Sequence, residues 1–98
     1  MPTFITLISY ESFEMMAELD PEEFLEPTRE VIQTHGGELL DYYLTMGQYD
    51  AVAVAEFPNA EAATQAYLTV LQGEGADTET LRAFTEEETR NLITSLSD

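Results

Sequence analysis

The order of apolar segments in this 98-residue chain predicts an α+β fold, a ferredoxin-like βαββαβ sandwich with an extra C-terminal helix. Two observations predict it. Four short segments are rich in β-branched and aromatic residues, which favours β-strands. Three other stretches begin with helix-start signals and place apolar residues at helical spacing. With 44% hydrophobic residues and no linker or internal repeat, the chain is expected to form a single domain over residues 1–98.

The first predicted unit is a strand followed by a helix. The strand runs from Thr3 to Tyr10 (TFITLISY), and the pattern of residues 11–19 fits either a helical turn or an apolar loop. The helix starts at Asp20-Pro21-Glu22-Glu23, which combines an N-cap residue, proline at the first helical position and glutamate at the third. Gly36-Gly37 ends it, because glycine readily adopts the backbone conformation found just past a helix C-terminus.

A hairpin follows this unit. The second strand is predicted over Leu39–Met46 (LLDYYLTM) and the third over Tyr49–Phe57 (YDAVAVAEF). Only Gly47-Gln48 lies between them, which leaves room for a tight turn with Gly47 at a positive φ.

A second helix, a fourth strand and a last helix complete the pattern. Asn59 caps the second helix, and its buried stripe is expected to comprise Ala63, Ala66, Tyr67, Val70 and Leu71. The fourth strand is predicted over Thr78–Phe84. Thr85 and Glu88 then form a capping box for the last helix, with apolar positions at Leu92, Ile93 and Leu96.

Both faces of the predicted sheet are apolar. In each strand, alternate residues point to opposite faces, and apolar residues occupy both faces. In the first strand Phe4 and Ile8 are expected on one face, and Ile5 and Leu7 on the other. In the second strand Leu40 and Leu44 are opposite Leu39 and Tyr43, and in the third Val52 and Val54 are opposite Ala51, Ala53, Ala55 and Phe57. One layer of helices covers only one face, so a second copy of the sheet is expected to cover the other in a homodimeric, dimeric α/β-barrel type assembly. The alternative is that the terminal helix folds under the open face.

The charge is strongly acidic, with 3 Lys+Arg against 20 Asp+Glu, no lysine, and a net charge of −17. This goes beyond the magnitude of ~2–8 that keeps a small domain soluble. Acid excess with loss of lysine is typical of proteins made for a salt-filled cytoplasm, so we expect a halophilic, cytoplasmic protein. The alternative is a nucleic-acid mimic or an acidic partner of a basic protein. The charge argues against nucleic acid as a partner, because phosphates are bound by lysine and arginine, so we expect none.

Several other classes are excluded by what the sequence lacks. The chain has no cysteine, which removes disulfide scaffolds and thiolate metal sites. No apolar run reaches the ~18 residues of a membrane span, and no basic segment of a signal peptide is seen. Metalloprotease, nucleophile-elbow and phosphate-loop motifs are also missing. We therefore expect no membrane partner, no metal and no cofactor, and assign no catalytic residue.

The hairpin and the fourth strand carry distinctive motifs, LTMGQYD over Leu44–Asp50 and TETLRAFT over Thr78–Thr85. With the initial MPTFITLISY and Gly36-Gly37, they make the chain resemble the GYD domain family. The family is named for a Gly-Tyr-Asp motif, which here is Gly47, Tyr49 and Asp50. The resemblance implies a small stand-alone domain with a ferredoxin-like, dimeric α/β-barrel form. It implies no established activity.

Three polar residues near the hairpin and in the fourth strand are candidate ligand-binding residues: Tyr49, Asp50 and Arg82. Arg82 interrupts an apolar strand in a chain poor in bases, so it is expected to pair with Asp50 or Glu56. The three residues then form either the polar floor of a pocket for a small polar or anionic ligand, or a buried pair that sets the strand register or the dimer seam.

Two further residues are candidates for the same site. His35 is the sole imidazole, and it acts either as a general base or metal ligand or as a histidine placed where the helix dipole favours a cation. Tyr42 lines a cavity for an apolar or aromatic ligand, or else belongs to the core.

Three functions are compatible with these observations. The first is a small homo-oligomeric domain that binds a small molecule in a pocket between sheet and helices. The second is a cofactor-free isomerase or oxygenase-like enzyme of the dimeric α/β-barrel type, and the third is a purely structural or assembly protein. A cavity of ~300 Å³ or more with two convergent polar groups favours the first two, whereas a filled core favours the third.

The stability of the protein should rise steeply with KCl up to molar concentration. Glutamates three or four residues apart on a helix, such as Glu22, Glu26 and Glu30, lie only ~5–6 Å from one another. Only about 1 M salt shortens the Debye length below that separation. Thermal melts across a KCl series measure the effect, and melting temperatures that stay constant from low to molar salt would exclude the halophilic interpretation.

Overall fold

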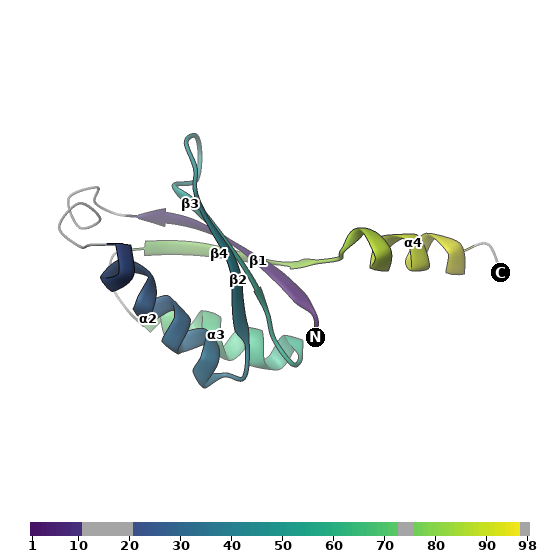
Figure 1. Cartoon of the computed structure of the whole chain (residues 1–98), viewed down its shortest axis with the longest axis horizontal. Helices are drawn as coiled ribbons and strands as arrows, with labels where there is room; N and C mark the ends of the chain where they lie inside the picture. Colours follow the sequence, from purple (N-terminus) through teal and green to yellow (C-terminus); the bar gives the residue numbers. More distant parts are fainter. Residues whose placement is uncertain (11–20, 73–75, 97–98) are drawn as a thin grey trace.

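The computed structural model describes residues 1–10, 21–72 and 76–96. Their elements are β1 (Thr3–Tyr10), α2 (Pro21–Thr34), β2 (Glu38–Leu44), β3 (Ala51–Glu56), α3 (Ala60–Gln72), β4 (Ala76–Ala83) and α4 (Glu86–Ser95) (Figure 1). This confirms the predicted α+β class. The expectations for residues 11–19 and for the Asp20 cap lie outside the described residues. No helix in the described part of the chain is long and apolar enough to cross a membrane.

The four strands form one antiparallel sheet in the order β2-β3-β1-β4. β1 lies in the centre and pairs with β3 on one side and with β4 on the other, from Thr3 opposite Ala83 to Tyr10 opposite Ala76. β4 therefore starts two residues earlier than the sequence predicts, because β1 provides a partner along its whole length. The arrangement is compatible with the ferredoxin-like expectation.

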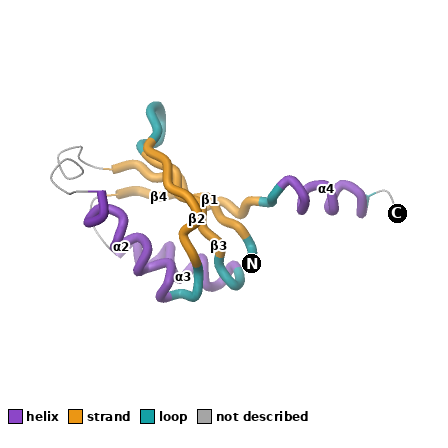
Figure 2. The backbone as a smooth tube through the Cα atoms, in the orientation of Figure 1, coloured by secondary structure: helices purple, strands orange, loops and turns teal. Residues whose placement is uncertain are grey.

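Helices α2 and α3 lie on the same side of the sheet and cover one of its faces (Figure 2). The core between the two layers has large side chains at Phe4, Ile32 and Phe57. The rings of Phe4 and Phe57 pack edge to face, with their centroids 5.8 Å apart. Five alanines of β3 and α3 fill the space beside them and are buried: Ala51, Ala53, Ala55, Ala63 and Ala66. Small side chains thus occupy the middle of this layer.

The helix ends follow the signals in the sequence. At the end of α2, Gly36 has a φ of 81°, its N–H donates to the carbonyl of Gln33 at 3.0 Å, and the N–H of Gly37 donates to Ile32 at 2.9 Å. This pair of bonds is a Schellman motif. Asn59 Oδ1 accepts from the N–H of Ala62 at 2.8 Å, which confirms the predicted cap of α3.

The turn between β2 and β3 is longer than predicted. The N–H of Thr45 donates to the carbonyl of Asp50 at 2.8 Å, which closes a loop over the four residues between them. β2 therefore ends at Leu44 and β3 begins only at Ala51, so the expected two-residue turn is wrong. The positive φ of Gly47, at 125°, is confirmed.

An irregularity in β2 changes which of its side chains share a face. The pairing with β3 shifts between Leu39 and Asp41, so Leu40 has no partner in the register. After the shift, Tyr42 lies opposite Ala53 on the helix side and Tyr43 opposite Val52 on the other side. The prediction that Leu39 and Tyr43 share a face is therefore wrong, because simple alternation cannot account for an extra residue.

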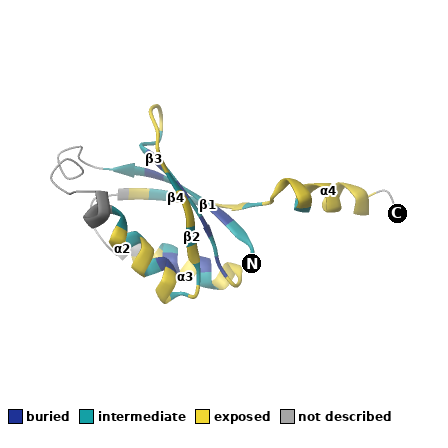
Figure 3. Cartoon of the chain, in the orientation of Figure 1, coloured by how far each residue is buried: buried dark blue, intermediate teal, exposed yellow. Residues whose placement is uncertain are grey.

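The other face of the sheet, here called the open face, is apolar at its centre and has no covering layer in the described structure. It carries the half-buried Ile5, Leu7, Val52 and Val54 and the more exposed Tyr43 and Leu81. The register places four acidic residues around this apolar centre: Asp41, Glu56, Asp77 and Glu79. The terminal helix α4 does not fold under this face. It extends away from the rest of the protein, so that the molecule measures 54 Å along its longest axis and 20 Å along its shortest (Figures 1 and 3).

Replacing Gly37 with alanine should destabilise the protein by about 1–3 kcal/mol, because the new methyl group has no space. A Cβ at this position would lie 2.5 Å from the carbonyl oxygen of Glu56 and 2.7 Å from the Phe57 ring. Urea unfolding measures the loss. Glu38→Ala, at the exposed neighbouring residue, is the control and should stay within about 0.5 kcal/mol of the parent. A Gly37→Ala variant as stable as this control would contradict the packing described here.

Candidate functional site

A cavity of about 120 Å³ lies between the sheet and the two covering helices; it is called here the sheet–helix cavity. One part of its wall is apolar and comprises Ile8, Val31, Ile32, Ala53, Ala55, Phe57, Ala63 and Ala66. The rest carries hydroxyl groups, from Thr6, Tyr10, Thr28, Tyr67, Thr78 and Thr80. No charged side chain is among the described residues that line it.

Thr6, Thr78 and Thr80 form one wall of the cavity, here called the hydroxyl wall, because of the register between β1 and β4. Thr6 pairs with Thr80, and their Oγ1 atoms lie 3.1 Å apart in a hydrogen bond. Thr78, two residues before Thr80, points to the same side of β4. Its Oγ1 is buried and has no hydrogen-bond partner in the described part of the chain. A buried hydroxyl without a partner costs stability, so its position at a cavity wall indicates a place for a hydrogen-bonding ligand or water.

A wider groove of about 360 Å³ adjoins this cavity on the side of the edge strand β4. The two spaces share Ala63, Tyr67, Thr78 and Thr80 as lining residues. Arg82 and Glu79 are charged residues that line the groove. The cavity thus continues into a larger and more polar space between α3 and β4.

Tyr10 and Tyr42 close the end of the site nearest the hairpin. Their hydroxyl oxygens lie 2.9 Å apart and share a hydrogen bond. Burial, the Tyr42 hydroxyl and the charge of Asp50 all raise the pKa of Tyr10 well above its ordinary value. The pKa of Tyr42 is also raised, mainly by burial. Both phenols therefore stay protonated at neutral pH.

The residues of the predicted Gly-Tyr-Asp motif fasten the hairpin loop to the sheet. Asp50 Oδ2 accepts from the N–H of Tyr10 at 2.8 Å, and the N–H of Asp50 donates to Ile8 of the same strand at 2.8 Å. The Tyr49 hydroxyl donates to Glu79 Oε2 on β4 at 2.8 Å, and this bond raises the pKa of Tyr49. Neither Tyr49 nor Asp50 is among the residues that line the cavity.

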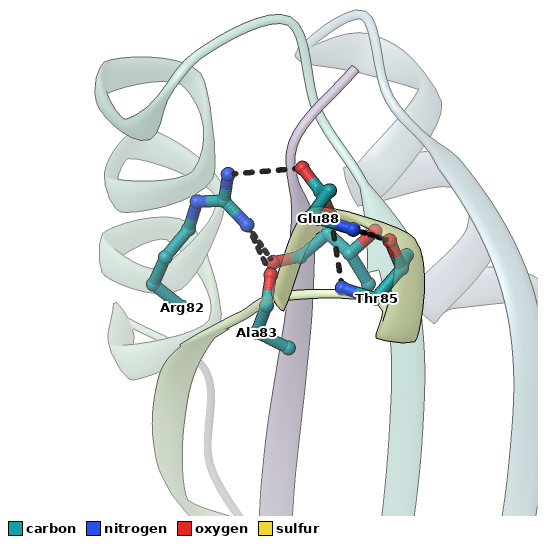
Figure 4. Close-up of polar contacts among 5 residues, drawn as sticks. Arg82, Ala83, Thr85 and Glu88 are labelled. Atoms are coloured by element: carbon teal, nitrogen blue, oxygen red, sulfur yellow. Dashed lines mark hydrogen bonds and ion pairs between the residues drawn. The ribbon is translucent and has the colours of Figure 1, made fainter. Parts of the chain in front are cut away.

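Arg82 lies at the opposite end of β1 from Asp50, and the expected pairing with Asp50 or Glu56 is wrong. Its Nη2 lies 3.8 Å from Glu88 Oε2 in the first turn of α4, and its Nη1 donates to the carbonyls of Thr3 and Ala83 (Figure 4). The guanidinium also lies over the ring of Phe84, 4.3 Å from its centroid. Arg82 is exposed, so a buried ion pair is wrong as well.

His35 connects the two covering helices rather than facing the cavity. It follows the last residue of α2, and its Nε2 lies 3.4 Å from Thr69 Oγ1 of α3. No group of three or more metal-binding side chains occurs among the residues that the structure describes. The geometry favours the interpretation of His35 as a residue at a helix end.

The motifs and the fold agree with one family. The model of the GYD domain family matches residues 4–93. The chain belongs to the GYD domain family. The match extends from β1 into α4, so it includes the hairpin motif and both strands of the hydroxyl wall. No functionally curated protein matches this GYD domain.

Two solved structures are similar to this GYD domain. The crystal structure of TTHA0845 from Thermus thermophilus is 25% identical, with a TM-score of 0.56, and the match covers 87% of this chain and 95% of that chain. The hypothetical protein PHS023 from Pyrococcus horikoshii is 19% identical, with a TM-score of 0.53, and the match covers 88% of this chain and 93% of that one. Both similarities support the fold, and neither structure's name indicates an activity.

The structure brings only some of the predicted site residues together. Tyr42 reaches the cavity through its bond to Tyr10, and Arg82 lines the adjoining groove. Sequence reasoning missed the threonines, although one signal was present: Thr78, Thr80 and Arg82 occupy alternate positions of one strand and thus share a face.

Stability should fall as the pH rises above about 10, and Tyr10→Phe should reduce that fall. The raised pKa of Tyr10 means that the phenol ionises more easily in the unfolded chain, where its pKa is about 10. The folded state therefore binds more protons above pH 10, and its stability decreases. Thermal melts from pH 8 to about 11 measure this dependence. Tyr43→Phe, which removes an exposed hydroxyl from β2, is the control, and its stability should decrease with pH as much as that of the parent. Identical pH dependence of all three proteins would contradict the described Tyr10 environment.

Proposed function

We propose that this GYD domain binds a small, uncharged, largely apolar molecule in the sheet–helix cavity, and that it does so as a homodimer. The unpartnered hydroxyl of Thr78 carries the proposal, because a buried polar atom at a cavity wall is satisfied by a ligand atom. Apolar walls with a few fixed polar groups are the usual composition of small-molecule sites.

The size of the cavity limits the ligand. Its 120 Å³ is below the ~300–1,000 Å³ of sites for drug-sized molecules but close to the ~150 Å³ of a cavity that accepts benzene. A single ring or a short branched chain fits this space. A larger ligand extends past Tyr67 and Thr78 into the groove beside β4.

The charge of the protein argues for a neutral ligand. A net charge of −17 repels anions, and the cavity carries no cation among its described lining residues to offset that repulsion. This replaces the anionic ligand considered from the sequence, since Arg82 is engaged with two carbonyls and Glu88.

Binding is favoured over proton-transfer catalysis. Among the described lining residues the only titratable side chains of the cavity are phenols, and the raised pKa of Tyr10 makes it a poor acid or base near neutral pH. The cofactor-free isomerase alternative needs a group that exchanges a proton in this range.

The proposed homodimer follows from the open face. Large apolar surfaces of this kind mark interfaces in soluble proteins, and two-fold pairs are the commonest assembly. A second copy turned face to face covers Ile5, Leu7, Val52 and Val54 and gives the dimeric α/β-barrel form. The acidic composition supports a cytoplasm rich in salt as the place where this pair forms, because salt screens the repulsion between the copies.

Phenol and benzene make a matched pair of probes for the cavity. Both should shift the NMR signals of cavity residues such as Ile8 and Ala53, and Thr78→Val should weaken phenol binding about fivefold, since one hydrogen bond is worth about 1 kcal/mol. Benzene binding should be the same in Thr78→Val and the parent. Thr34→Val, at an exposed position of α2 outside the cavity, is the control and should bind both probes like the parent.

Two results would contradict the proposal. Absence of cavity shifts with either probe at millimolar concentration would show that the cavity does not take ligands of this class. Equal weakening of benzene and phenol by Thr78→Val would show that the variant changes packing, and the threonine hydroxyl would then have no role in recognition.

A further inference from the structure

The terminal helix α4 is amphipathic and has no covering partner in the described structure. At about 100° per residue, Leu92, Ile93 and Leu96 fall within a stripe about 100° wide. None of the residues of α4 is buried, and these three side chains are 50%, 61% and 84% exposed. The opposite side is polar and carries Glu87, Asn91 and Thr94. The ion pair of Arg90 with Glu86 at 2.7 Å flanks the stripe on the side of Ile93. A helix of this pattern has a face for packing that its own domain does not use.

Contacts at the start of α4 hold the helix away from its own sheet. Thr85 and Glu88 form a complete capping box, with bonds of 2.9 and 3.1 Å in the two directions. Glu88 also faces Arg82, which is itself bound to the carbonyl of Thr3 at the beginning of β1 (Figure 4). These bonds link the first turn of α4 to the end of β4. In this arrangement α4 extends past the end of the sheet and does not lie against either of its faces (Figure 1).

The size of the open face is a second observation. Four strands about 4.8 Å apart and about 20 Å long present roughly 400 Å². Two such faces bury about 800 Å² in total, which is the size of a crystal contact and less than the about 1,200 Å² of a standard stable interface. A helix of 10 residues is about 15 Å long and about 10 Å wide. Two exchanged helices add roughly 600 Å² and bring the total into the standard range.

We propose that α4 is an arm that packs against a second copy of this chain, along the β2 margin of its open face. This inference rests on the proposed homodimer. Sheets that stack face to face cover their centres first, so an arm needs apolar surface at a margin. The β2 margin provides it in Tyr43, which is 57% exposed and lies opposite Val52 on this face. Each copy then supplies one arm and receives one, as two-fold symmetry requires.

A second copy fits the arm better than a basic partner protein would. The apolar stripe of α4 carries no charged residue, whereas Glu86, Glu87 and Arg90 lie outside it and stay in solvent. A partner chosen for its positive charge would bind the acidic side of α4 and leave Leu92, Ile93 and Leu96 exposed.

Analytical ultracentrifugation of the full chain in about 1 M KCl tests the arm. Ile93→Asp should raise the dimer dissociation constant at least about tenfold, while far-UV circular dichroism shows an unchanged fold. Leu68→Asp is the matched control, since Leu68 lies on α3 and is 52% exposed, close to the 61% of Ile93. This variant adds the same charge and should dimerise like the parent.

The arrangement of the arm is tested on dimers mixed from isotopically labelled and unlabelled protomers. Isotope-filtered NMR should show contacts between the Ile93 methyl groups and the Tyr43 ring of the other protomer. A dimeric parent in which Ile93→Asp dimerises as tightly as Leu68→Asp, or in which all contacts of Ile93 are within one protomer, overturns the arm and leaves the homodimer standing. A parent that stays monomeric at micromolar concentration overturns both.

Discussion

The sheet of this GYD domain has apolar side chains on both faces, but helices cover only one of them. Most features of the structure depend on this difference between the covered face and the open face. The covered face is closed by α2 and α3 over a central strand of alanines, Ala51, Ala53 and Ala55, which keep the layers close without filling every space between them. The cavity lies in this layer. The open face keeps Ile5, Leu7, Val52 and Val54 outside any core of the single chain, which makes association the natural way to bury them.

The residues of the family motif have structural roles that are visible in the hydrogen bonds. Asp50 binds the backbone of β1, Tyr49 binds Glu79 of β4, and Gly47 adopts a φ that other residues avoid. Together they hold the β2–β3 loop against the sheet. The loop in turn positions Tyr10 and Tyr42 at the end of the cavity. A motif that gives the family its name therefore shapes the site without lining it.

Two of the three arginines of the chain contact acidic residues at the start of α4. Arg82 and Arg90 both contact glutamates of the first turn of α4, Glu88 and Glu86 respectively. The hydrogen bond from the Thr85 N–H lowers the pKa of Glu88, and Arg82 adds to this effect. These contacts are exposed and contribute little stability individually. Their consequence is geometric, because they determine the direction in which the terminal helix leaves the sheet.

Features that depend on neighbours in sequence were predictable from the sequence alone. The Thr85–Glu88 capping box, the Asn59 cap, the Gly36-Gly37 helix end and the alternation in β1 and β3 all appear as expected, because each is decided within a few residues. The tertiary structure decided the rest. The hydroxyl wall of Thr6, Thr78 and Thr80 depends on strand register, which brings Thr6 and Thr80 together although they are 74 positions apart. The extra residue at Leu40 depends on how β2 pairs with β3, and the contact of Arg82 with Glu88 depends on the direction in which α4 leaves the sheet. Such pairings are selected by the packing of whole layers, and no local pattern carries that information.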